Sequence, residues 1–223
     1  MISRIKIDDV AFRIIRILLF AAICGSITTA AAQDDVSGKA FKESALLKKR
    51  EQSAAKDIDK YAIQLDKTGR ALTRLGRADG KDLRKHYESF SKELKKLGEA
   101  QERAISSLDR MKATGVEYFS SWEKANASIS DPELREIAAQ RRSLVMLSHI
   151  ELGRAVGDIG LQLQPFMGGA HDLRAFLGAD LTPENVRRAG DRIHACQADV
   201  EALKSRIGEV QTTFKRLLNE MPE

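Results

Sequence analysis

The sequence contains little of what disulfide scaffolds, aromatic-rich cores and irregular loop folds require. Of its 223 residues, 2 are cysteine, 4 are proline and 5% are aromatic. Two cysteines are too few for a disulfide framework, and scarce proline leaves long helices uninterrupted. Charged residues, by contrast, make up 31% of the chain, which is typical of long helices and coiled coils.

Sequence motifs for catalysis and cofactor binding are also missing. A nucleotide site needs a glycine-rich loop between a strand and a helix, and neither is evident here. A di-iron centre in a helical bundle takes two Glu-x-x-His pairs, whereas this chain offers only Asp191 and His194, one turn apart. We therefore predict a protein that is not an enzyme and that has no catalytic, cofactor-binding or metal-binding residues.

The other histidines do not have the spacing of metal ligands either. His86, His149 and His171 fall on different helical segments. Of these, His149 is the one expected to be buried, as a hydrogen-bonded core residue. Glycines at 153, 157 and 160 share one helical stripe and predict a close contact with another helix.

The net charge of +5 is spread along the chain. Short basic runs occur at 48–50, 95–96, 141–142 and 187–188, each beside acidic residues and without interleaved aromatics. A nucleic-acid-binding protein would gather its basic residues into one stripe. The pattern instead predicts a solvated surface of mixed charge, with no nucleic acid as partner.

Residues 1–32 read as a signal peptide. A basic stretch precedes the short apolar run Ile17–Cys24, and small residues follow at Ala30–Ala32. The run is too short for a stable membrane span, and its pattern predicts cleavage after Ala32. A lipid anchor at Cys24 is disfavoured because Ile23 precedes it. The prediction is a periplasmic or secreted protein of a Gram-negative-type bacterium, in contact with the membrane only through its signal peptide.

The rest of the chain, 33–223, is predicted to be one elongated helical domain. Apolar residues recur at alternating spacings of three and four, which indicates helices with a seam facing other helices. We expect helices at about 37–76, 82–126, 131–178 and 183–220. Because the connections are short, successive helices should be antiparallel, giving an all-α, coiled-coil-like bundle of about four helices.

The second helix has the strongest periodicity. Its seam is Leu83, Tyr87, Phe90, Leu94, Leu97, Gln101, Ala104, Leu108, Met111, Gly115, Tyr118 and Trp122. The last helix places Cys196, the sole cysteine after cleavage, in a similar seam, which predicts a buried apolar role for the thiol. Phe41, Tyr118, Phe119, Trp122 and Phe214 are expected near one end, as an aromatic cap.

Several local signals predict where helices begin, bend or shift. Ser130 before Pro132 suggests an N-cap, and Thr182 before Pro183 suggests a second. Pro165 should kink the third helix. The seam of that helix begins with Leu134 and Ala138 and is expected to slip by one step around 149–156.

Three segments resemble one bacterial family, the domain of unknown function numbered 2959. They are Lys48–Leu72 (KKREQSAAKDIDKYAIQLDKTGRAL), Asp82–Leu94 (DLRKHYESFSKEL) and Leu163–Leu181 (LQPFMGGAHDLRAFLGADL). The similarity covers about residues 39 to 193. It implies an exported or lipid-anchored helical protein of about this length, but no activity and no functional residues.

These observations favour an exported, non-catalytic interaction or scaffold protein of the cell envelope, with envelope proteins as partners. A periplasmic holdase-type chaperone for envelope proteins is the first alternative. A metal-binding or enzymatic bundle is the second. The heptad seams can close within one chain or between copies, so a homo-oligomer is also open.

Overall fold

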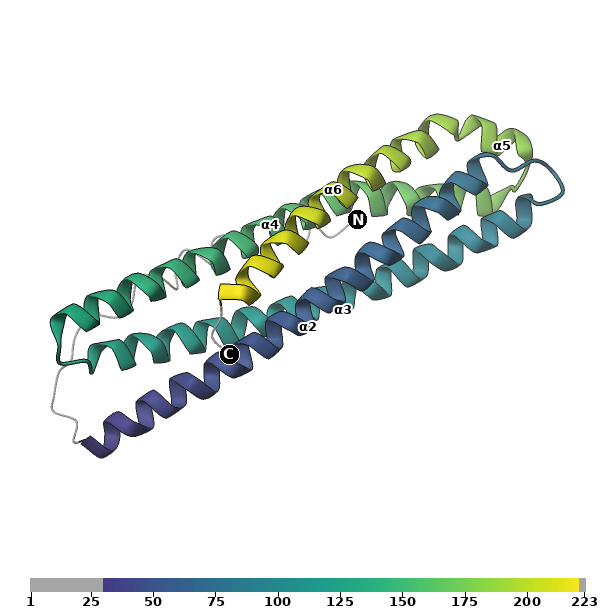
Figure 1. Cartoon of the computed structure of the whole chain (residues 1–223). Helices are drawn as coiled ribbons and strands as arrows, with labels where there is room; N and C mark the ends of the chain where they lie inside the picture. The colour runs from purple at the N-terminus through teal and green to yellow at the C-terminus, as the bar shows by residue number, and fades with distance from the viewer. Residues whose placement is uncertain (1–29, 221–223) are drawn as a thin grey trace, which may run out of the picture.

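The fold consists of long helices lying side by side. A computed structural model describes residues 30–220, with side chains from residue 38 onward. In this range the helices are α2 (Ala30–Gly76), α3 (Leu83–Ala127), α4 (Pro132–Ala179), α5 (Pro183–Arg188) and α6 (Gly190–Glu220). Successive long helices are antiparallel, and the short α5 leads into α6 (Figure 1). The predicted all-α antiparallel bundle is confirmed.

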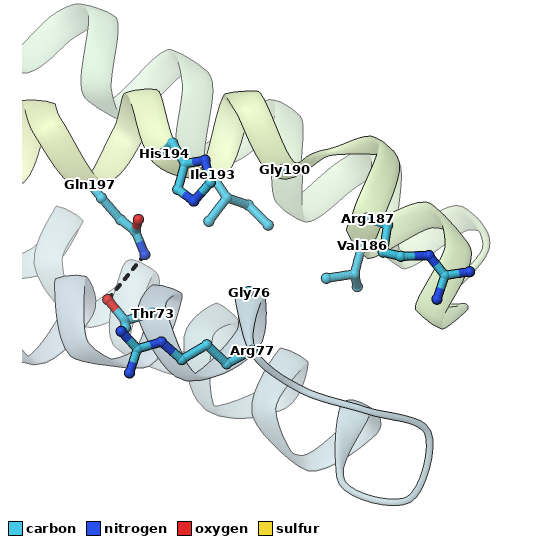
Figure 2. Close-up of a pocket in the computed structure, with 9 residues that line it drawn as sticks. All are labelled: Thr73, Gly76, Arg77, Val186, Arg187, Gly190, Ile193, His194 and Gln197. Atoms are coloured by element: carbon cyan, nitrogen blue, oxygen red, sulfur yellow. Dashed lines mark hydrogen bonds between the residues drawn. The ribbon is translucent and has the colours of Figure 1, made fainter.

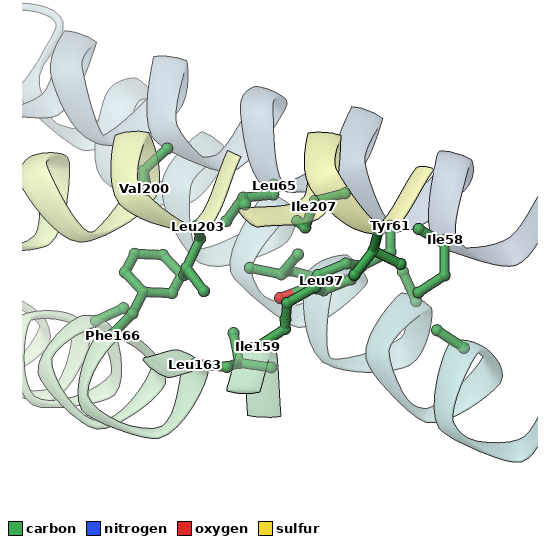
Figure 3. Packing of buried hydrophobic residues seen from close by; sticks show 14 of the residues in the cluster. Ile58, Tyr61, Leu65, Leu97, Ile159, Leu163, Phe166, Val200, Leu203 and Ile207 are labelled. Atoms are coloured by element: carbon green, nitrogen blue, oxygen red, sulfur yellow. The ribbon is translucent and has the colours of Figure 1, made fainter. Parts of the chain in front are cut away.

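The four long helices surround one core. α2 packs against α3 and α6, and α4 packs against the same two helices. α2 and α4 therefore occupy diagonal positions. Leu65 of α2, Leu97 of α3, Phe166 of α4 and Leu203 of α6 point toward a shared interior (Figure 3). The seams thus close within a single chain.

The α3 seam follows the predicted heptad rhythm. Nine of its twelve positions are buried, and the other three, Tyr87, Gln101 and Trp122, are half-buried. Cys196 is buried in the α6 seam, where burial raises the pKa of its thiol. A raised pKa keeps the thiol protonated and unreactive. The prediction that Cys196 is a core residue is confirmed.

Helix boundaries agree with the sequence for α3 and α4 but differ at two other places. α2 begins at Ala30 instead of residue 37, and the predicted fourth helix is divided at Ala189 into α5 and α6. α4 continues unbroken through Pro165. Apart from Ala30–Ala32, the predicted signal peptide and Cys24 lie outside the described residues.

One of the two predicted N-caps is wrong. Asp131, not Ser130, caps α4, because its carboxylate accepts hydrogen bonds from the backbone amides of Glu133 at 2.8 Å and Leu134 at 3.1 Å. Thr182 caps α5 as predicted, with its hydroxyl oxygen accepting from the amide of Asn185 at 3.2 Å.

The predicted register slip in α4 does not occur. Buried residues recur every seven positions at Val145, Leu152 and Ile159, and the series continues through Phe166 and Leu173. The intervening seam positions include the half-buried His149 and Val156. The sequence suggested a slip because the histidine interrupts the apolar pattern.

A regular ladder of polar contacts joins α2 to α6. The Gln197 side chain donates to the Thr73 hydroxyl at 3.1 Å, Lys204 forms an ion pair with Asp66 at 3.4 Å, and Gln211 donates to Asp59 at 2.7 Å. These partners are spaced by seven residues on both helices. The ladder therefore follows the same heptad repeat as the core beside it.

Small residues bring α2 and α6 close together. A Cβ at Gly69 would lie 2.8 Å from Cγ1 of Val200, and one at Gly76 would lie 3.0 Å from Cγ2 of Ile193. Both are closer than ordinary van der Waals contacts. The close helix contact predicted for the glycines of α4 is wrong, because nothing lies within 4 Å of a Cβ at 153, 157 or 160.

Replacing Gly69 with alanine is expected to lower the free energy of unfolding. Alanine is the better helix former by about 1 kcal/mol, but the new methyl group would collide with Val200, whose branched side chain is stiff. Overpacking typically costs about 1–3 kcal/mol. Urea denaturation would measure the change.

The matched control is Gly98→Ala in α3, where a Cβ would meet no atom within 4 Å. Here helix propensity acts alone, so the free energy of unfolding should rise. If both substitutions stabilise the protein equally, α2 and α6 are not in close contact at Gly69.

Candidate functional site

Of the four long helices, α6 is the shortest, and it does not reach one end of the bundle. α6 has 31 residues whereas α4 has 48. Its last residue, Glu220, lies beside Arg141 and Ser148 of α4. Beyond this level, the described residues belong to α2, α3 and α4 (Figure 1). We call this region the open end; it comprises residues 38–50 of α2, 115–127 of α3 and 132–147 of α4.

The α2 side of the open end exposes an aromatic ring. One heptad position of α2 faces α6 and carries only small residues where α6 covers it. These residues are Gly76, Gly69 and the half-buried Ala62 and Ala55. Two heptads further toward the N-terminus of α2, the same position is Phe41, which is 68% exposed. The residue is small where a helix covers it and large where none does.

The α4 side of the open end exposes several leucine and isoleucine residues. Leu134 lies eleven residues before the buried Val145, so it faces the bundle axis, yet it is 58% exposed. Ile137 is 56% exposed, and Leu144 is also exposed. Leu134 and Ala138 were predicted as buried seam positions. Leu134 is exposed and Ala138 only half-buried, because α6 does not extend over them.

Aromatic residues of α3 lie at the same end. The ring centroids of Tyr118 and Phe119 are 5.2 Å apart, and those of Tyr118 and Trp122 are 5.3 Å apart. Burial raises the pKa of the Tyr118 hydroxyl, and a hydrogen bond with Ser44 partly offsets this. Three members of the predicted aromatic cap, all on α3, thus lie together. Phe41 is exposed and does not join them, and Phe214 is buried in the α6 seam.

A buried polar pair lies just beneath the open end. Glu51 of α2 is 0% exposed, and its Oε1 atom is 3.4 Å from Nδ1 of His149 on α4. The imidazole also packs edge-on against Phe119. Gly115 of α3 makes room for it, because a Cβ there would lie 2.7 Å from Nε2.

Neither partner of this pair is satisfied by hydrogen bonds. Both carboxylate oxygens of Glu51 and both ring nitrogens of His149 lack a hydrogen-bond partner among the described residues. His149 was expected to be a buried, hydrogen-bonded core residue, but it is half-buried in the seam and the hydrogen bond is not formed. A buried polar group without a partner costs about 1–3 kcal/mol, and more when charged.

Unsatisfied polar atoms are concentrated in this part of the molecule. In the described chain, six residues bury a side-chain nitrogen or oxygen without a hydrogen bond, and the full set is Glu43, Arg50, Glu51, Tyr61, Ser91 and His149. Four of the six lie at or just below the open end. Buried polar groups there are less often hydrogen-bonded than in the rest of the described core.

Sequence reasoning missed Glu51. The buried residues Leu47 and Ala54 lie seven positions apart in α2, and the seam position between them is residue 51. A charged residue at a seam position indicates either a surface-facing gap or a buried polar pair. Only the structure, which brings His149 opposite, distinguishes the two.

Replacing His149 with leucine is expected to destabilise the protein by about 1–3 kcal/mol, because it leaves the buried polar side chain of Glu51 facing an apolar group. The double variant Glu51→Leu, His149→Leu should recover most of this loss, since both polar groups are then removed. Urea denaturation of the two single variants and the double variant gives the coupling energy. An additive result would show that the two side chains do not interact.

The other histidines and Asp191 do not come together as a metal-binding group in the described part of the chain. Asp191, His194 and His171 are exposed, and His86 is half-buried. Within residues 30–220, no group of three or more His, Cys, Asp or Glu side chains is arranged to hold a metal ion. No helix of the same range is long and apolar enough to cross a membrane.

A small cleft lies at the other end of the bundle, between the C-terminal end of α2 and the α5–α6 junction. Its volume is about 160 Å³. Arg77, Arg187 and His194 line it together with Thr73 and Gln197 (Figure 2). It is distant from the open end, because α2 runs the length of the bundle between them.

Comparisons with protein-family models, curated proteins and solved structures find no match to this chain.

Proposed function

We propose that this protein is an exported, non-catalytic interaction protein of the cell envelope that binds a helical segment of a partner protein at its open end. The observation that carries the proposal is the exposure of Phe41, Leu134 and Ile137 where α6 stops. Such apolar surface beside a packed core favours binding of a further apolar face. A helix is the shape that continues the four-helix arrangement.

The charge around these residues favours an acidic partner. Residues 38–50 of α2 contain five lysine or arginine residues and one glutamate. Lys42 and Lys49 are exposed and form no ion pair with any described residue. We infer an amphipathic helix with acidic residues flanking its apolar stripe, since complementary charge favours encounter and register. The part of α4 that precedes the buried Val145 is about 13 residues long, so it offers a contact surface about 20 Å long to a partner helix.

A holdase-type chaperone is the second candidate. Exposed apolar residues at a bundle end would also hold unfolded segments. The two proposals differ in their partners, because a chaperone binds many unfolded chains whereas an interaction protein binds one defined helix. The family resemblance is compatible with both and names no activity.

In-cell photo-crosslinking at position 137 would test the proposal. We expect the crosslink to form with one envelope protein, at a segment that mass spectrometry maps to an amphipathic helix with acidic flanks. A crosslinker at Leu161, which is exposed on the same helix but away from the open end, is the matched control. Equal yields at 137 and 161 would contradict a specific site.

A second variant tests the contact itself. Leu134→Glu should reduce crosslinking at 137 at least about tenfold, because it places a charge in the apolar contact and repels an acidic partner. Leu134 is exposed, so folding should be unaffected, as circular dichroism would verify. Crosslinks to a second copy, or to many unfolded proteins, would replace the proposal with self-association or chaperoning.

Export is proposed from the N-terminal pattern and has its own test. Mass spectrometry of the protein purified from the periplasmic fraction should find Gln33 as the first residue. A diacylated Cys24 as the first residue would instead mean a lipid-anchored protein. Protein retained in the cytoplasm with residues 1–32 intact would contradict export.

A further inference from the structure

α4 carries a second seam on its surface, in addition to the seam that it buries in the core. The residues of this second seam are spaced alternately by four and three positions, which is the period at which helices pack along one another. All of them are exposed. We call this set the outer seam, and it consists of Arg154, Asp158, Leu161, Pro165, Gly168 and Asp172.

The middle of the outer seam is uncharged and open. Residues 159–170 include no aspartate, glutamate, lysine or arginine, although 31% of the chain is charged. Leu161 is 67% exposed, and a Cβ at Gly157, Gly160 or Gly168 would meet no atom within 4 Å. Such a surface favours contact with another uncharged face, and its glycines allow the backbone of a second helix to approach closely.

Charges of opposite sign flank this uncharged stretch at equal distances. Arg154 lies nine positions before Leu163, and Asp172 lies nine positions after it. Arg154 forms no hydrogen bond or ion pair with any described residue. Asp172 contacts Arg192 only through Oδ2, at 3.8 Å. Both side chains can therefore take a further partner of opposite charge.

We propose that the outer seam binds the outer seam of a second copy of this chain, with the two α4 helices antiparallel. A twofold axis at the level of Leu163 places Arg154 of each copy opposite Asp172 of the other. The same axis places Leu161 opposite Pro165, and Asp158 opposite Gly168, which has no side chain. The outer seam is thus complementary to itself, which identifies a second copy as its occupant.

The charges also select the antiparallel arrangement over the parallel one. In a parallel pair Arg154 would face Arg154, and Asp158 would face Asp158, so that like charges would repel. The contact lies outside the open end, which includes only residues 132–147 of α4. The inference therefore does not rest on the proposed function.

Analytical ultracentrifugation of the purified protein tests the contact. We expect a dimer with a Kd of roughly 1–100 µM, because a single helix pair forms a small interface. Leu161→Glu should weaken it at least about tenfold, since it places two like charges near the axis. Ile63→Glu on α2, at a position that is 56% exposed, is the matched control and should change the Kd less than about twofold.

A charge swap tests the pairing of Arg154 with Asp172. Arg154→Asp should weaken the dimer about three- to tenfold, because both ion pairs of the symmetric contact become repulsive. The double variant Arg154→Asp, Asp172→Arg should restore the Kd to within about twofold, because the opposite charges face each other again. Circular dichroism would verify that these exposed substitutions leave the helices intact.

A photo-crosslinker at position 175 tests the direction of the helices. In the antiparallel dimer position 175 lies opposite Glu151 of the other copy, whereas in a parallel dimer it lies opposite position 175. Positions 151 and 175 of one chain are about 36 Å apart along α4, so a crosslink between them must join two copies. A crosslinker at 161 would also join two copies, and the doubled mass separates this product from a crosslink to an envelope partner.

Three results would overturn the proposal. The first is a monomer at several hundred micromolar. The second is equal weakening of the dimer by Leu161→Glu and Ile63→Glu. The third is a crosslink from position 175 to the same position of a second copy, or to a different protein.

Discussion

The close packing of α2 against α6 is the contact on which the rest of the bundle depends. α6 reaches the core because Gly69 and Gly76 present no side chains to Val200 and Ile193. With α6 in place, the α4 seam is covered along most of its length, and the diagonal pair α2 and α4 enclose a common interior. Without that approach, the apolar seams of three long helices would remain exposed on one side.

The length of α6 then determines what the bundle exposes. α2, α3 and α4 each have 45 or more residues, whereas α6 has 31. The apolar seam of α4 is continuous in sequence, but its residues change from buried to exposed at the level of Glu220, where α6 ends. The change from small residues to Phe41 at one heptad position of α2 follows the same level. Both features coincide with the end of α6, so the exposure at the open end has a counterpart in the sequence of α2.

Much of the fold could be predicted because helix periodicity and caps are local properties. The α3 seam and the cap at Thr182 depend only on residues close in sequence, and both are confirmed. Leu134 could not be predicted in this way. It has the heptad register of a buried residue, but it is exposed because α6, which is distant in sequence, ends before reaching it. Which of Ser130 and Asp131 caps α4 depends on backbone angles that spacing does not reveal.

The candidate sites were less predictable than the fold because each combines residues from different helices. His149 was recognisable as a core histidine, but its neighbour Glu51 is 98 positions away and becomes visible only when α2 and α4 lie diagonally. The same holds for Arg77 and Arg187, which are unremarkable basic residues in sequence and line one cleft in space.

The position of the Glu51–His149 pair gives it a structural consequence that its energy alone does not suggest. Apolar heptad seams tolerate axial shifts of whole heptads, because leucine can replace leucine in each layer. A polar pair in one layer opposes such shifts, since moving α4 by one heptad would leave both groups buried among apolar residues. The pair therefore favours the present level of α4 relative to α2. It lies just below the point where α6 ends, so the same register places Leu134 and Ile137 in the exposed α4 stretch.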